Sequence, residues 1–225
     1  VLFLNGGAHI QHHYFFNSGN YDGSNKNPDW YITENYDPLL EILEQYDSLL
    51  YDLQELKNTR LIIATGLQQN PTTKPIYFWR FKNHNAFLEK LDIKFKEVQT
   101  LMSRDFIIRF DNNNDLIKAE EILKNIKPKL EENSIFEIDN RGDNLFVSLM
   151  YSDNLNNNVD FFLHGKKLSN IRDDVDFVAI KNGGHHKTGF YLDSRSKPDD
   201  IKTILPVHKL FNIVMNHFKI TDPTD

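Results

Sequence analysis

Hydrophobic residues recur at spacings of three and four along residues 38–56, and this period predicts an amphipathic helix. Asp37 followed by Pro38 is typical of an N-cap and a first helical turn. Three further helices are predicted: residues 83–91, capped by Asn83, residues 115–127, ended by Pro128, and residues 206–218.

Short apolar runs predict the strands. Val1–Leu4 and Val175–Ile180 each lead into an Asn-Gly-Gly segment, and Arg60–Thr65 ends at Gly66. Further extended segments are predicted at 76–81, 93–98 and 105–110, with a hairpin formed by 135–138 and 144–151. A helix feeding a strand is typical of a βαβ unit, so we expect an α/β fold with a mostly parallel sheet flanked by helices. Residues 1–225 are expected to form one α/β domain, with a small α+β insertion at about 70–150.

Two glycine–histidine segments carry the main chemical signal. The first is Asn5-Gly6-Gly7-Ala8-His9, and the second is Asn182-Gly183-Gly184-His185-His186. Ligands of open α/β sheets gather beyond the carboxyl ends of strands, where glycines let the backbone come close to them. Imidazole is a common metal ligand and a general acid or base near neutral pH. The alternative is that these are solvated loop histidines.

Composition narrows the function classes. The net charge of −6 and the pI of about 5.8, with no basic stripe, disfavour nucleic acid as a bulk partner. The absence of cysteine excludes disulfides and thiolate metal sites. No apolar run approaches the roughly 18 residues that a membrane span requires. The cytoplasm is the default expectation. Because the chain opens in an apolar run without an initiator Met, we expect it to be the C-terminal part of a longer polypeptide.

The order of these segments resembles that of a known family. Leu2–His9, taken as a strand followed by Asn-x-x-x-His, is similar to the Asp-x-x-x-His metal motif of the alkaline phosphatase superfamily, particularly its nucleotide pyrophosphatase/phosphodiesterase branch. The helix at 38–56, the strand at 60–65 and the late Gly183-Gly184-His185 segment follow in the same order. The resemblance implies an alkaline-phosphatase-like fold and a hydrolase that uses a divalent metal, zinc or similar.

The resemblance also implies particular ligands. His9 and His185 correspond to metal histidines, Asn5 stands where the family has an anionic Asp, and His12 is an additional candidate in the same segment. Two features depart from the family pattern: Asn5 is neutral, and no Asp-His pair follows the strand at 60–65. The family's nucleophile would lie outside this chain.

Arg80, Arg104 and Asp105 form a second candidate group. Arginine binds phosphate, sulfate or carboxylate through two parallel hydrogen bonds. Arg104-Asp105 precedes an apolar strand, where it could face a cleft and orient a substrate. The alternative is a structural ion pair.

These observations lead to two hypotheses. The first is a hydrolase or transferase that acts on a phosphate-type or sulfate-type ester of a small molecule or glycan. The second is a member of the same fold with a degraded metal site, kept to bind an anionic glycan or a protein partner. Under either one, the missing N-terminal part or another chain is an expected partner.

Overall fold

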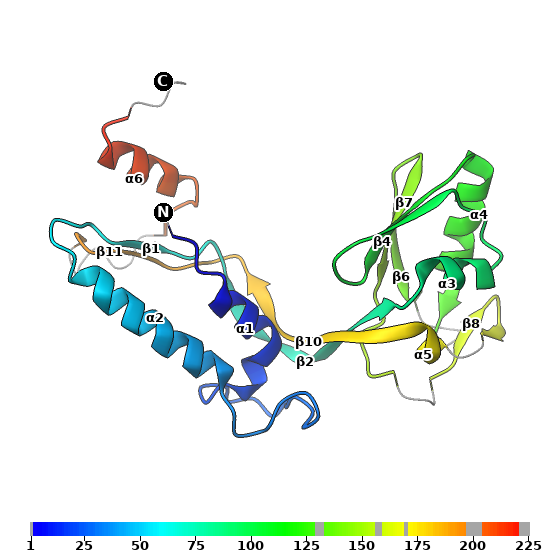
Figure 1. The fold of residues 1–225 in the computed structure, drawn as a ribbon, viewed down its shortest axis with the longest axis horizontal. Helices are drawn as coiled ribbons and strands as arrows, with labels where there is room; N and C mark the ends of the chain where they lie inside the picture. The colour runs from blue at the N-terminus through cyan, green and yellow to red at the C-terminus, as the bar shows by residue number, and fades with distance from the viewer. Residues whose placement is uncertain (1, 129–132, 156–158, 169–170, 197–203, 221–225) are drawn as a thin grey trace.

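Two lobes joined by a long two-stranded ribbon make up the body of this 225-residue chain in a computed structural model (Figure 1). The structure describes residues 2–128, 133–155, 159–168, 171–196 and 204–220. The ribbon pairs β2 (Gln68–Phe81) with β10 (Val175–His186) in antiparallel register. We call the described residues of 2–67 and 187–196 the helical lobe, and those of 82–174 the sheet lobe.

The helical lobe is built on two helices, α1 (Gly6–Tyr14) and α2 (Pro38–Gln54), with a short 3-10 turn η1 (Phe15–Asn17). The predicted cap of α2 is confirmed, because the Asp37 carboxylate accepts hydrogen bonds from the amides of Leu39 and Leu40 at 3.0 and 2.9 Å. Strand β1 (Ile62–Ala64) pairs antiparallel with β11 (Tyr191–Asp193). A separate helix, α6 (Lys209–His217), has no buried residue.

The sheet lobe holds the larger core. Its four-stranded antiparallel sheet, in the order β3-β4-β7-β6, is formed by Glu97–Thr100, Asp105–Arg109, Asn144–Leu149 and Phe136–Asn140. Alternate residues of β4 and β7 are buried, which is the two-residue period of a sheet with one covered face. Helix α4 (Asn113–Lys124) packs on β6 and β7, and α3 (His84–Lys90) packs on β3. A smaller sheet, in the order β5-β8-β9, is formed by Ile126–Lys127, Phe161–Leu163 and Lys166–Leu168. The short helix α5 (Ile171–Asp174) precedes β10 and contacts it.

The predicted fold class is wrong. Every strand pairing in the described part of the chain is antiparallel, so the fold is a mixed α+β arrangement of small sheets. It is not a mostly parallel, alkaline-phosphatase-like sheet flanked by helices. Residues 2–4 form no strand and are exposed, and Val1 lies outside the described residues. Without a first parallel strand, α2 and β1 do not form a βαβ unit. A short apolar run predicts burial or extension but does not give the direction of its partner strand.

The ribbon itself is longer than the sequence predicts. The segment 68–75, expected to be a loop because it contains Pro71 and Pro75, belongs to β2. Proline is tolerated at edges and bulges, where no ladder hydrogen bond is lost. Pro71 faces Gly183 next to a break in register between Lys181 and Gly183, so a bulge accommodates the proline.

A buried histidine in the sheet lobe gives a pH-dependent stability. His84, the first residue of α3, is 4% exposed and lies against the rings of Phe81 and Phe106. Its Nε2 has no hydrogen-bond partner among the described residues. Burial, followed by the positive charge of Arg80, lowers the pKa of His84 to about 4.

We therefore expect acid to destabilise the protein through His84. The unfolded chain takes up the proton near pH 6.5 and the folded chain only near pH 4, so stability is highest above pH 6.5 and falls between these values. The loss approaches about 3 kcal/mol at pH 4. Urea unfolding at pH 7.5, 5.5 and 4.5 measures it, and His84→Phe should flatten the dependence. Equal losses in the variant and the parent would contradict this assignment.

Candidate functional site

The two glycine–histidine segments come together in the structure, but neither is a loop at a strand end. Gly6 and Gly7 begin α1, and residues 182–186 are the last part of β10. A Cβ atom on Gly183 would lie 2.3 Å from the backbone oxygen of Gln11, far inside contact distance. This glycine therefore lets helix α1 pack directly on the ribbon. The helix occupies the position where the sequence predicted a ligand.

The contact between helix and ribbon brings two histidines together. The Nε2 atoms of His12 and His185 lie 2.9 Å apart, although the residues are 173 positions apart in the sequence. The Nδ1 of His12 lies 2.9 Å from the carbonyl oxygen of Gly183. Because a carbonyl only accepts, Nδ1 of His12 carries a proton. In its neutral form His12 therefore presents the Nε2 lone pair, to which His185 donates its Nε2 proton.

The surroundings of His12 favour this neutral form. Burial lowers the pKa of His12 below its ordinary value of 6.5, and the positive charges of Lys181, His185 and His13 act in the same direction. The hydrogen bond to the Gly183 carbonyl opposes them but does not reverse the shift. In this pair His12 thus accepts a hydrogen bond at Nε2, and His185 donates it.

The other predicted metal ligands lie nearby without joining this pair. The ring of His9 packs on His13 at 4.8 Å between centroids, and Nδ1 of His13 donates to the Ile180 carbonyl at 2.7 Å. Asn5 is the N-cap residue of α1 but makes no side-chain capping hydrogen bond. His12 and His185 are therefore the predicted ligands whose ring nitrogens meet, in place of His9 and His185.

The residues present do not fit a resident hydrolytic metal centre. The described residues contain no group of three or more His, Asp or Glu side chains placed to hold a metal ion. The His12 and His185 nitrogens are also closer than the ~3.3 Å expected between two ligands of a tetrahedral zinc ion. Two imidazoles without a carboxylate leave the charge of a dication poorly neutralised, so we assign no metal ion to this pair.

A buried amide fixes the position of helix α1 and was not singled out from the sequence. Asn182 is fully buried in β10, and its Oδ1 accepts from the Phe15 amide at 2.7 Å. Its Nδ2 donates to the His13 carbonyl at 2.9 Å and to Oδ1 of Asn27 at 2.7 Å. The Asn-Gly-Gly pattern marked this position, but only the topology shows that the asparagine holds the end of the helix that carries the histidines.

The second predicted group, Arg80, Arg104 and Asp105, does not meet the histidine pair. The Arg104 guanidinium lies over the Phe78 ring at 4.4 Å, and Asp105 accepts a hydrogen bond from the Ser148 hydroxyl at 2.7 Å. Arg80 is on β2, where its charge acts on His84. No contact between these three residues and His12 or His185 occurs in the part of the chain that the structure describes.

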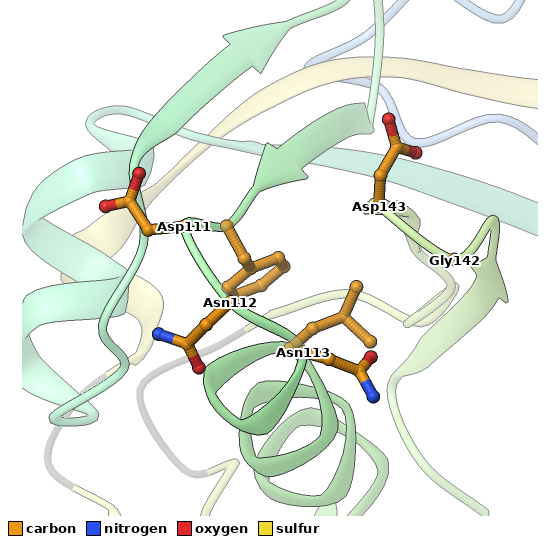
Figure 2. Close-up of a pocket in the computed structure, with 7 residues that line it drawn as sticks. Asp111, Asn112, Asn113, Gly142 and Asp143 are labelled. Carbon is orange, nitrogen blue, oxygen red and sulfur yellow. The ribbon is translucent and has the colours of Figure 1, made fainter.

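Two cavities lie away from the histidine pair. Figure 2 shows the first, of about 240 Å³, between the start of α4 and the β6–β7 turn, with Asp111 and Asp143 at its rim. It is smaller than the roughly 300–1,000 Å³ usual for ligand pockets. The second, of about 400 Å³, is lined by Ile10 and α2 residues such as Ile42 and Gln45. Neither is lined by His12 or His185.

Comparison with known proteins returns no relative. No protein-family model, no curated protein and no solved structure matches this chain. None of the described helices is long and apolar enough to cross a membrane.

Proposed function

We propose that this protein is a hydrolase or transferase acting on a phosphate-type or sulfate-type ester, with His12 and His185 as its acid–base pair. The observation that carries the proposal is the 2.9 Å contact between their Nε2 atoms, made by residues of different elements. The tautomer of His12 is defined by the Gly183 carbonyl, so the acceptor and the donor have separate roles.

In the proposed chemistry, Nε2 of His12 accepts a proton from the attacking hydroxyl of water or an acceptor alcohol. In its doubly protonated imidazolium form, His185 donates its Nε2 proton to the leaving oxygen of the ester and is left as a neutral imidazole. The hydroxyl oxygen forms the new bond to phosphorus or sulfur as the bond to the leaving oxygen breaks, so proton and electron pair balance. Binding of the ester would replace the direct contact between the two rings.

The experiment measures hydrolysis of generic aryl phosphate, phosphodiester and sulfate esters by the full-length protein. We expect His12→Ala and His185→Ala each to lower kcat/KM on the order of 100-fold. His9→Ala distinguishes the two possible histidine pairs. If His9 and His185 act together, as the family resemblance implies, kcat/KM should fall by a comparable factor. If His12 and His185 act together, as the geometry indicates, the loss of kcat/KM should be small. His208→Ala, an exposed residue before α6, is the control. Full activity in both His12→Ala and His185→Ala would overturn the proposal.

A second candidate is a catalytically degraded member of its fold that binds an anionic glycan or a protein partner. The observation that favours it is the lack of a three-ligand acidic or histidine group among the described residues. Turnover of any of these esters by the parent protein, lost in His12→Ala and His185→Ala, would count against it. The cytoplasmic location and a further chain as partner stay predictions.

A further inference from the structure

An exposed tryptophan is held rigidly on the helical lobe. Trp30 is 60% exposed, yet its ring contacts those of Tyr31 and Phe177 at 5.9 and 5.0 Å between centroids. The turn beneath it is closed by the Pro28 carbonyl, which accepts from the Tyr31 and Ile32 amides. One aromatic face is thus presented to solvent at little further cost in side-chain entropy when a ligand binds.

The three rings form a packed cluster without a hollow between them. Trp30, Tyr31 and Phe177 meet at interplanar angles of 73 to 85°, with centroids 5.0 to 5.9 Å apart. This edge-to-face packing leaves no space for a cation among the rings, which excludes an aromatic cage of the kind that binds quaternary ammonium. The surface offered to a ligand is the exposed part of the Trp30 ring.

This aromatic surface continues toward the histidine pair. Tyr31 stacks on Tyr14 at 5.5 Å, and Tyr14 is two residues from His12 on helix α1. On β10, Phe177 lies at the Trp30 end of this surface and Gly183 at the histidine end. These two residues are six positions apart, which corresponds to about 20 Å in an extended strand. A ligand that reaches both ends must therefore be extended.

The charge and size of the surface indicate the class of ligand. Asp29 precedes Trp30, and the nearby Lys26 is paired with Glu34, so the charges next to Trp30 do not favour a polyanionic nucleic acid. Lys181 lies farther along β10, where its charge acts on His12 and His13. One exposed ring is also far smaller than the roughly 800 Å² per partner of a stable protein interface. A neutral sugar ring, with an apolar C–H face and hydroxyls at its rim, matches an exposed aromatic ring beside polar side chains such as Asp29 and Lys26.

We propose that Trp30 is a carbohydrate-stacking subsite that binds the neutral part of an extended glycan. This inference deepens the proposed function and rests on it in one respect only: the glycan would be the substrate whose ester lies at His12 and His185. Binding at Trp30 is measurable without hydrolysis.

The experiment uses the fluorescence of the full chain with neutral linear hexasaccharides: cellohexaose, xylohexaose, maltohexaose and chitohexaose. The sequence has two tryptophans, and because Trp79 is only 3% exposed, acrylamide quenching reports on Trp30. We expect at least one hexasaccharide to protect Trp30 from quenching. By calorimetry, Trp30→Ala should weaken its binding at least tenfold, and Trp30→Phe should retain part of the affinity.

Tyr51→Ala, which removes another exposed aromatic ring of the helical lobe, is the matched control and should bind as the parent does. Two competing probes, hexathymidylate and tetramethylammonium, should not protect Trp30. Protection by either in place of the sugars, no binding of any hexasaccharide, or unchanged binding by Trp30→Ala would overturn the proposal. His12→Ala should keep the sugar binding, so a loss of the ester chemistry alone leaves this inference standing.

Discussion

Replacing Phe106 with alanine is expected to destabilise the protein by about 3 to 5 kcal/mol, the cost of deleting a fully buried aromatic side chain. Phe106 lies on β4, is 0% exposed and contacts the rings of Phe81, His84 and Phe136. Removing its ring leaves a cavity that these neighbours cannot fill without leaving their own contacts. The loss falls on the sheet lobe, where the cluster of buried hydrophobic side chains lies.

Urea unfolding monitored by Trp79 fluorescence measures this loss, because Trp79 belongs to the same buried cluster. Phe190→Ala is the matched control, since that phenylalanine is 68% exposed and its removal should change stability by less than about 0.5 kcal/mol. Similar midpoints for the Phe106 and Phe190 variants would show that Phe106 is not a core residue.

The second large effect is expected in the helical lobe, from Asn182→Ala. The change leaves the Phe15 amide and Oδ1 of Asn27 without the partner that they share, whereas the His13 carbonyl still accepts from Nδ2 of Asn27 at 3.4 Å. Each buried polar group left unpaired costs about 1 to 3 kcal/mol, so the two groups together cost about 2 to 6 kcal/mol. Because these bonds join the end of α1 to β10, the helix should separate from the ribbon before the sheet lobe unfolds.

Hydrogen exchange distinguishes this local effect from global unfolding. The amides of α1 should lose protection in Asn182→Ala, whereas those of β4 and β7 should keep it. The rate of ester hydrolysis should fall with α1 protection, because His12 and His185 meet only while the helix is in place. Asn70→Ala, an exposed position on the same ribbon, is the control. Unchanged protection of α1 would contradict the role given to Asn182.

Local sequence signals predicted some of the elements, although not helix α1 or the first half of β2. The Asp37-Pro38 start of α2 is confirmed, as is the capping asparagine Asn83, whose side chain accepts from the Ala86 amide at 3.0 Å. The hairpin of β6 and β7 also follows the predicted turn at 140–143. These features depend on a few neighbouring residues, so they can be recognised without the rest of the chain.

What the sequence could not supply is how distant segments pair. Val175–Ile180 is extended, as predicted, but it pairs antiparallel with β2 and continues to His186. The partner of His185 depends on that pairing: the register and the close approach at Gly183 select His12, whereas the family resemblance implied His9. Periodicity gives the face of an element but not its neighbour.

The pairing of Phe81 with Val175 at one end of the ribbon has a consequence for modularity. The 93 positions between them begin and end on adjacent strands, within the roughly 5 Å that separates cross-strand partners. A tight hairpin turn could therefore replace the whole sheet lobe without moving the histidine pair. The sheet lobe therefore occupies the place of an insertion between two paired strands.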